Sequence, residues 1–85
     1  MTEKYKKEKE EIRKQLRDNF DGFLNANLTP REQAIIIMRY SLKDENIYTL
    51  QDVGEILGAT RERIRQIQAK AICKLEKSKI IKTKI

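Results

Sequence analysis

The run from Thr49 to Ile67 constrains the fold of this chain more than any other part of its sequence. Apolar residues recur at helical spacing on both sides of Gly58. Glycine adopts positive φ without strain, so Gly58 allows the chain to leave one helix and enter the next at a steep angle within about three residues. Gly54 falls where the two helices would cross, and a larger side chain there would hold them apart. The run therefore predicts a helix-turn-helix. Its shared core is expected to contain Val53, Ile56, Ile64 and Ile67.

Capping residues mark the starts of three helices. Thr49 with Asp52 three residues later forms a capping-box pattern, and Thr60 can cap the second helix of the helix-turn-helix. A third start, Thr29–Glu32, combines a cap, a proline at the first helical position and a glutamate three residues after the cap. These patterns indicate where each of the three helices begins.

The outward face of the second helix carries side chains that match the edges of DNA bases. Apolar residues at intervals of three and four must face the core, which leaves arginine, glutamate and glutamine outside in the first two turns. In the major groove arginine can pair with guanine, glutamine can pair with adenine, and glutamate can accept a hydrogen bond from cytosine. An ordinary solvated charged face is the alternative, and the preceding glycine turn favours DNA reading over it. The predicted base-reading residues are Arg61, Glu62 and Gln66.

The basic charge of the chain is concentrated on this helix and on the residues that follow it. Residues 61–85 carry nine Lys or Arg against two Glu, a net charge of +7, whereas residues 1–60 have a net charge of −1. This distribution suits a polyanionic partner, so DNA binding should weaken as the salt concentration rises. Arg63, Lys70 and Lys74 flank the base-reading face and are suited to phosphate contacts.

Composition argues against most catalytic chemistry. The chain has no His, and Cys73 is its only Cys, which removes the usual zinc sites, the Cys/His and Ser/His nucleophile systems and an internal disulfide. With 85 residues, a large enclosed active site is not expected. We therefore predict a protein that is not an enzyme and needs no cofactor or metal. No apolar run approaches the length of a membrane span and no signal-peptide pattern precedes the charged start, so a cytoplasmic protein is expected.

Two segments before the helix-turn-helix are also expected to be helical. Residues 3–24 form a charged amphipathic pattern, and the segment from Pro30 to about Leu42 has two apolar faces. One face serves the core of the domain. The other must be covered by the N-terminal helix alone or by another protein, and the sequence leaves both possibilities open. The first face comprises Ile35, Met38 and Leu42, and the second comprises Ile36, Ile37 and Tyr40.

The predicted fold class is all-α, a single small domain of about four helices that ends in a helix-turn-helix with a long recognition helix. We divide it into an N-terminal amphipathic helix and linker (1–27), a core (28–76) with the helix-turn-helix at 49–76, and a basic tail (77–85). The tail is expected to fray in solution, because it combines scattered isoleucines with many lysines at a chain terminus.

Several segments resemble region four of bacterial primary sigma factors. The resemblance runs from about Leu28 to Leu75 and is most specific in its second half. It implies an all-helical domain that reads the upstream promoter hexamer, the minus-thirty-five element, and docks on the flap of the RNA polymerase β subunit in the bacterial cytoplasm, associated with the nucleoid. The segments that carry it are Leu28–Glu32, Met38–Tyr40, Thr49–Leu50, Val53–Gly54, Thr60–Ile67 and Ala69–Ala71.

The resemblance assigns roles to individual positions. It implies that Arg61, Glu62 and Gln66 read bases. Cys73 departs from the pattern, since such factors commonly have an arginine there that is used toward the DNA backbone or activators. The residues predicted for phosphate or activator contact are Thr60, Arg63, Arg65, Lys70 and Lys74, and those for the polymerase flap are Phe20, Phe23, Ile36, Ile37 and Tyr40.

Three functions remain open from the sequence. The first is promoter binding coupled to RNA polymerase, with an activator or a protein that supplies the other sigma regions as further partners. No segment resembles the aromatic-rich sigma regions that bind the downstream hexamer and melt DNA. The second is a small regulator that mimics region four, occupies the β flap and displaces or modifies the resident sigma factor. The third, a repressor that dimerises through its N-terminal helix, is disfavoured because residues 5–24 are too irregular for a good coiled coil.

Overall fold

The computed structural model describes the backbone of residues 3–82 and the side chains of residues 9–82. Within these residues the chain forms five α-helices and no β-strand, which confirms the predicted all-α class. The helix not foreseen is α2, which is separate because the Asn19 side chain accepts a hydrogen bond from the Gly22 N–H and caps a new helix. The helices are α1 (Glu3–Asp18), α2 (Phe20–Leu24), α3 (Pro30–Arg39), α4 (Leu50–Leu57) and α5 (Arg61–Lys77).

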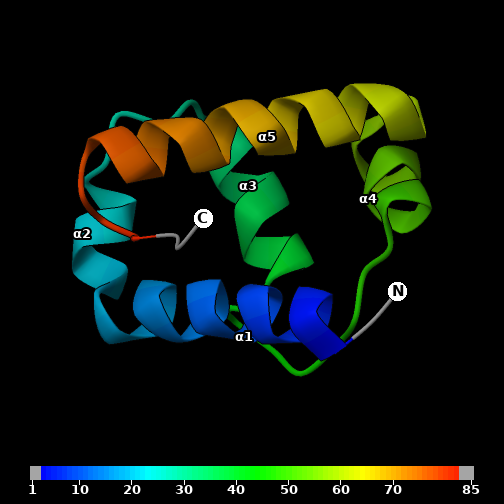
Figure 1. Cartoon of the computed structure of the whole chain (residues 1–85). Helices are drawn as coiled ribbons and strands as arrows, with labels where there is room; N and C mark the ends of the chain where they lie inside the picture. The colour runs from blue at the N-terminus through cyan, green and yellow to red at the C-terminus, as the bar shows by residue number, and fades with distance from the viewer. Residues whose placement is uncertain (1–2, 83–85) are drawn as a thin grey trace.

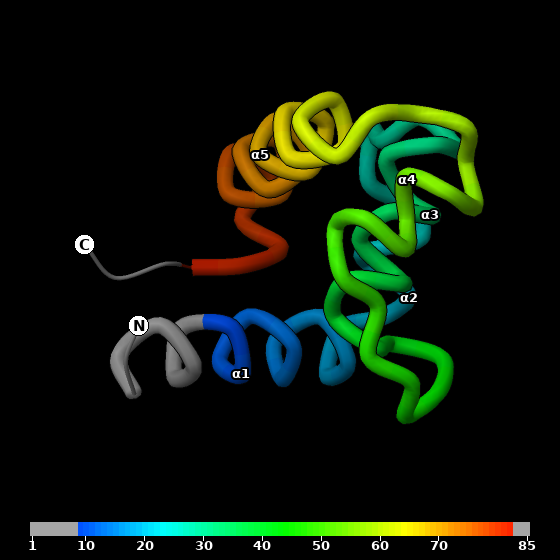
Figure 2. The backbone as a smooth tube through the Cα atoms, turned by 90° about the vertical axis from the view of Figure 1, so that its right-hand side faces the viewer, coloured from blue at the N-terminus to red at the C-terminus, as the bar shows by residue number. Residues whose placement is uncertain are grey.

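The helices form two layers (Figures 1 and 2). α1 and α5 lie in one layer, and α3 crosses between them in the other. α4 packs against the first part of α5 at one end of the molecule, while α2 lies at the opposite end (Figure 1). The last described residues run back between α5 and α1 (Figure 2). This arrangement leaves the first turns of α5 at one end of the domain, supported from behind by α4.

α3 separates two hydrophobic cores. Its residue Ile35 packs with α4 and α5, whereas Ile36 and Tyr40 pack with α1, α2, the second half of α5 and the end of the described chain. Most of the second face of α3 is therefore covered by the domain itself, with Ile36 0% and Tyr40 7% exposed, whereas Ile37 is half-buried. The first core comprises Ile35, Val53, Ile64 and Ile67, and the second comprises Leu16, Phe23, Ile36, Tyr40, Ala71, Leu75 and Ile81.

α3 ends before its predicted limit at Leu42. Tyr40 is the C-cap, and Ser41 has a φ of 52°, a left-handed conformation that stops the helix. The guanidinium of Arg13 donates a hydrogen bond to the carbonyl of Tyr40 at 3.0 Å, which satisfies one of the acceptors that a helix leaves free at its end. Leu42 therefore lies beyond α3 and packs against the second core, so its predicted place on one helical face with Ile35 and Met38 was wrong.

The expectation that the basic tail frays is wrong for its first residues. Ile81 is 1% exposed and belongs to the second core. The side chain of Gln15 in α1 donates to the carbonyl of Lys82 at 3.0 Å and accepts from the N–H of Lys82 at 2.7 Å. One buried isoleucine and two hydrogen bonds offset the conformational entropy lost by this short segment. Residues 83–85 lie outside the described part of the chain.

Replacing Ile81 by valine should lower the free energy of unfolding by about 1 kcal/mol, because it removes one methylene from a fully buried side chain. Urea denaturation followed by far-ultraviolet circular dichroism measures this change. The same replacement at Ile47, which is 80% exposed, should change stability by less than about 0.5 kcal/mol. Equal stability of the two variants would show that the tail does not pack in solution.

Candidate DNA interface

The turn between α4 and α5 has the predicted geometry. Gly58 adopts φ 72° and ψ 38°, the left-handed conformation expected of it, and the N–H of Ala59 donates to the carbonyl of Gly54 at 2.9 Å. A Cβ added at Gly54 would lie 2.5 Å from the carbonyl oxygen of Ala59. Because no side chain fits there, α4 approaches the start of α5 as closely as two backbones allow. The helix-turn-helix and the roles of both glycines are confirmed.

The predicted caps fix where the two helices begin. The Thr49 hydroxyl accepts from the N–H of Asp52 at 3.0 Å, and the Asp52 carboxylate accepts from the N–H of Thr49 at 3.0 Å. At the start of α5 the Thr60 hydroxyl accepts from the N–H of Arg63 at 3.1 Å. α5 therefore begins at Arg61, and its first turns are held in a defined orientation relative to α4.

One residue assigned to the shared core lies outside it. Ile56 is 57% exposed, whereas Val53 and Gly54 on the same helix are buried. The reason is the close crossing, which requires the face of α4 that bears Gly54 to point at α5 and thereby turns Ile56 toward solvent. The first core therefore contains Val53, Ile64 and Ile67 of the predicted set together with Ile35 of α3.

The three base-reading candidates share the solvent side of the first turns of α5. Arg61, Glu62 and Gln66 are exposed, while Ile64 and Ile67 anchor the opposite face in the first core. Their backbone is held from behind by packed side chains, so the three side chains project from a rigid element. Of the residues predicted for phosphate contact, Thr60, Arg63, Arg65 and Lys70 are also exposed.

Glu62 is paired with Arg65 in the free protein. The guanidinium donates two hydrogen bonds to the carboxylate, from Nε at 3.0 Å and from Nη2 at 2.6 Å. These bonds and the positive charge of Arg65 lower the pKa of Glu62, and the same contacts raise the pKa of Arg65. Glu62 is therefore ionised at neutral pH and can act as a hydrogen-bond acceptor, provided that Arg65 turns away or shares the carboxylate with its new partner.

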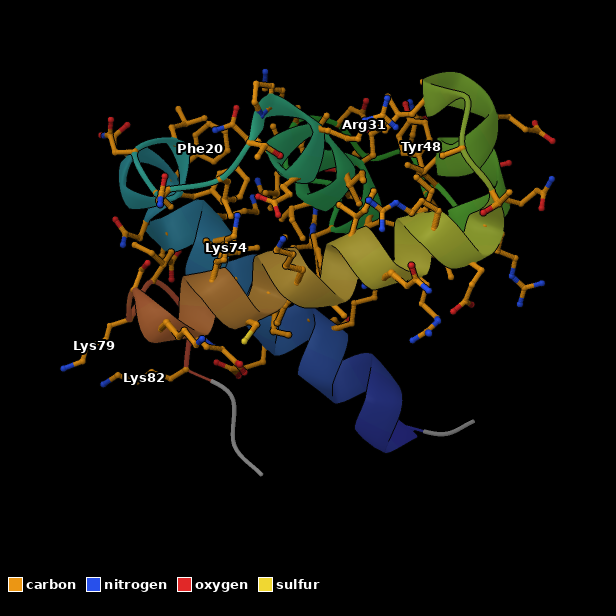
Figure 3. All side chains as sticks on the ribbon, turned by 90° about the horizontal axis from the view of Figure 1, so that it is seen from above. Phe20, Arg31, Tyr48, Lys74, Lys79 and Lys82 are labelled. Atoms are coloured by element: carbon orange, nitrogen blue, oxygen red, sulfur yellow. The ribbon has the colours of Figure 1, made fainter. Side chains whose placement is uncertain are left out.

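Lys74 differs from the other basic residues of α5 because its ammonium pairs with a buried carboxylate. Its ammonium lies 2.9 Å from Oε1 of Glu32, a carboxylate that is almost fully buried at the start of α3. Figure 3 shows Lys74 on the side of α5 that faces the earlier helices, whereas Lys79 and Lys82 point away from the domain at the end of the described chain. In this geometry Lys74 joins α5 to α3.

Comparison with known proteins identifies the family. The sequence matches the family "Sigma-70, region 4" over residues 26–77. The chain belongs to this family. The RNA polymerase sigma factor SigA1 of Synechococcus elongatus is 47% identical over 60 residues, which are 71% of this chain and 15% of that protein. SigA of Lactococcus lactis subsp. cremoris is 50% identical over 60 residues, 71% of this chain and 16% of its own length.

A further relative covers more of the chain. The probable RNA polymerase sigma-C factor of Synechocystis sp. is 40% identical over 74 residues, which are 87% of this chain and 18% of that protein. The chain thus spans less than a fifth of the length of these curated relatives. The resemblance to region four that the sequence indicated is confirmed.

One residue that positions α5 in this region 4 domain was not foreseen. Arg39, at the end of α3, donates to Oε1 of Gln68 in α5 at 3.0 Å and to the backbone carbonyl of Tyr48 at 2.6 Å. It therefore fixes α5 and the segment before α4 relative to α3. The sequence offered only a basic residue in the last turn of a helix, which is compatible with solvent exposure, so its partners could not be inferred.

Two features are absent from the described residues of the region 4 domain. Among them, no group of His, Cys, Asp and Glu side chains could hold a metal ion. No helix within the described part of the chain is long and apolar enough to cross a bilayer. The candidate DNA-contacting residues other than Lys74 gather on the exposed face at the start of α5.

Proposed function

We propose that this region 4 domain binds the minus-thirty-five element of bacterial promoters through α5 and contacts RNA polymerase through its earlier helices. The observation that carries the proposal is the exposure of Arg61, Glu62 and Gln66 together on the first two turns of a helix whose other face is buried. Such side chains distinguish base pairs in the major groove. The names of the relatives, RNA polymerase sigma factors, support the same partners.

The phosphate contacts are assigned to the exposed residues that flank the reading face. Thr60, Arg63, Arg65 and Lys70 supply a hydroxyl and three cations around it. The hydroxyl of Thr60 accepts a backbone hydrogen bond and keeps its own proton for a phosphate oxygen. Lys74 is not included in this role, because its ammonium is engaged by Glu32. Activators that bind beside the promoter are proposed to meet the same basic residues.

The polymerase contact is proposed for the end of the domain that carries α2. Phe23, Ile36 and Tyr40, which were predicted from the sequence to contact the flap, pack inside the second core and shape this end. Phe20 and Ile37 are half-buried at its edge and remain the candidates for direct contact with the β flap. The domain acts by binding and carries out no reaction of its own, in the bacterial cytoplasm and on the nucleoid.

Replacing Gln66 by alanine should remove most of the preference for the minus-thirty-five hexamer over a scrambled duplex, by about 1 to 2 kcal/mol or roughly 5- to 30-fold. The amide loses its contacts to a base, while the fold is kept because the side chain is exposed. Fluorescence anisotropy of both labelled duplexes at fixed near-physiological salt, with and without core RNA polymerase, gives the ratio of affinities.

The matched control is Gln33→Ala on α3, outside the reading face, which should leave the ratio unchanged. An unaltered hexamer preference in Gln66→Ala would contradict the base-reading assignment. Equal binding of the wild-type domain to both duplexes, together with tight polymerase association, would contradict promoter reading and favour a regulator that occupies the flap.

A further inference from the structure

Two isoleucines form an exposed apolar surface on the side of the domain that carries α4. Ile47 is 80% exposed and Ile56 is 57% exposed, the two highest values among the large hydrophobic side chains of the described residues. They line one open hollow together with Tyr48, which itself packs against the first core. We call this surface the α4 patch. Its residues are Asn46, Ile47, Tyr48, Asp52, Glu55 and Ile56.

The charge around the α4 patch is opposite to that of the rest of the chain. Residues 44–60 contain four carboxylates and no Lys or Arg, a net charge of −4, in a chain whose overall net charge is +6. The Asp52 carboxylate accepts a hydrogen bond from the Thr49 N–H, and the Glu55 carboxylate accepts one from the Gln51 side chain. Neither carboxylate forms a salt bridge with another described side chain. Of the other two carboxylates, Glu45 pairs with Arg13 at 4.0 Å, and neither Asp44 nor Glu45 lines the patch. The acidic rim of the apolar centre therefore consists of Asp52 and Glu55.

Exposed isoleucines next to carboxylates favour one kind of binding partner for the α4 patch. DNA phosphates and anionic lipid head groups are repelled by an acidic rim, so neither explains two exposed isoleucines there. An all-apolar partner would leave the carboxylates uncompensated. A helix with an apolar face bordered by lysines or arginines would bury Ile47 and Ile56 and pair with Asp52 and Glu55 at the edge of the contact.

We propose that the α4 patch docks a partner protein through such a basic amphipathic helix. The site is distinct from the proposed polymerase contact, because α4 and α2 lie at opposite ends of the domain (Figure 1). It is also distinct from the base-reading residues, which lie on α5. The domain thus has a third binding surface, which joins it to a basic partner while α5 engages promoter DNA.

The first test uses a defined probe. A fluorescein-labelled 14-residue helical peptide of leucines and lysines, about 21 Å long when helical, is titrated into the isotopically labelled domain, and a second peptide carries glutamate in place of lysine. Amide resonances of residues 46–56 should shift with the lysine peptide, and the affinity should fall as the salt concentration rises. Shifts elsewhere, no binding, or equal binding of the glutamate peptide would overturn the proposal.

Variants then locate the contact. Ile56→Ser should weaken binding of the lysine peptide about tenfold, because the exposed 57% of Ile56 is apolar surface that the peptide would bury and serine largely lacks it. The matched control is Leu24→Ser on α2, which removes a comparably exposed side chain, 42%, at the other end of the domain and should leave the affinity unchanged. Equal weakening by both replacements would overturn the assignment.

Two further measurements distinguish the α4 patch from the promoter-reading surface and from a surface for self-association. Ile56→Ser should bind the minus-thirty-five duplex as tightly as the wild type does. The test of the α4 patch is therefore independent of whether α5 reads promoter DNA. Sedimentation equilibrium of the protein alone should show a monomer. A dimer that Ile56→Ser dissociates would overturn the proposed partner and assign the α4 patch to contact between two copies of this chain.

Discussion

Replacing Gly54 by leucine is expected to lower the free energy of unfolding by about 3 kcal/mol, a large effect for a single substitution in the helix-turn-helix. A Cβ at this position already lies 2.5 Å from the carbonyl oxygen of Ala59 and 3.6 Å from the backbone nitrogen of Arg61. Backbone atoms cannot rotate away, so α4 and α5 must separate and open the first core. A domain of this size rarely has more than about 3 to 5 kcal/mol of stability, so much of the population should be unfolded.

Replacements by alanine measure how much of this destabilisation a single methyl group causes. Gly54→Ala should destabilise by about 1 to 2 kcal/mol although alanine is the better helix former by about 1 kcal/mol. Gly22→Ala provides the comparison with a side-chain clash, because the Cβ added there would meet only the side chain of Asn19. Moving that side chain costs at most the cap of α2, so the loss of stability should be smaller than at Gly54. Urea denaturation followed by circular dichroism compares the three variants. A Gly54→Ala protein as stable as wild type would mean that the helices do not cross as closely as the structure shows.

The parts of the fold that the sequence predicted are those determined by local chemistry. The left-handed turn at Gly58, the caps at Thr49 and Thr60 and the periodic inward residues of α5 each depend on neighbours within a few positions. Such signals can be read without knowing the tertiary structure. The exposure of Arg61, Glu62 and Gln66 followed from the same periodicity, which is why the candidate reading face could be placed from the sequence.

The parts that were missed depend on which helix faces which. The pairing of Lys74 with Glu32 joins residues 42 positions apart, and the hydrogen bond from Arg39 to Gln68 likewise joins two helices that are distant in the sequence. Ile56 fits a helical core pattern, but the rotation of α4 is fixed by the Gly54 crossing. Ile81 looked like part of a disordered terminus because nothing in its neighbourhood reveals the space between α1 and α5 that it fills. Periodicity identifies an apolar face but not the surface that covers it.

Replacing Glu32 by alanine is expected to lower the free energy of unfolding by about 2 to 3 kcal/mol at neutral pH. Its carboxylate accepts from the Thr29 N–H at 2.9 Å, which completes the capping box of α3, and from the Lys74 ammonium at 2.9 Å. The variant loses both and leaves the ammonium without its anion. Because the Lys74 side chain is 33% exposed, water replaces part of what is lost, and the cost stays below that of a fully buried ion pair.

The pH dependence of the free energy of unfolding tests whether the charge of Glu32 causes this loss of stability. Burial raises the pKa of this carboxyl, but hydrogen bonds from Thr29 and Lys74 and the charge of Lys74 together outweigh burial and lower it below its ordinary value. A lowered folded-state pKa means stability that is present above about pH 4.5 and is lost as the pH falls through the folded value. The stability advantage of wild type over Glu32→Gln should therefore be full at neutral pH and shrink on acidification. In a double-mutant cycle with Lys74→Met, the coupling between the two positions should disappear over the same pH range, whereas a constant coupling would show that the contact is not ionic.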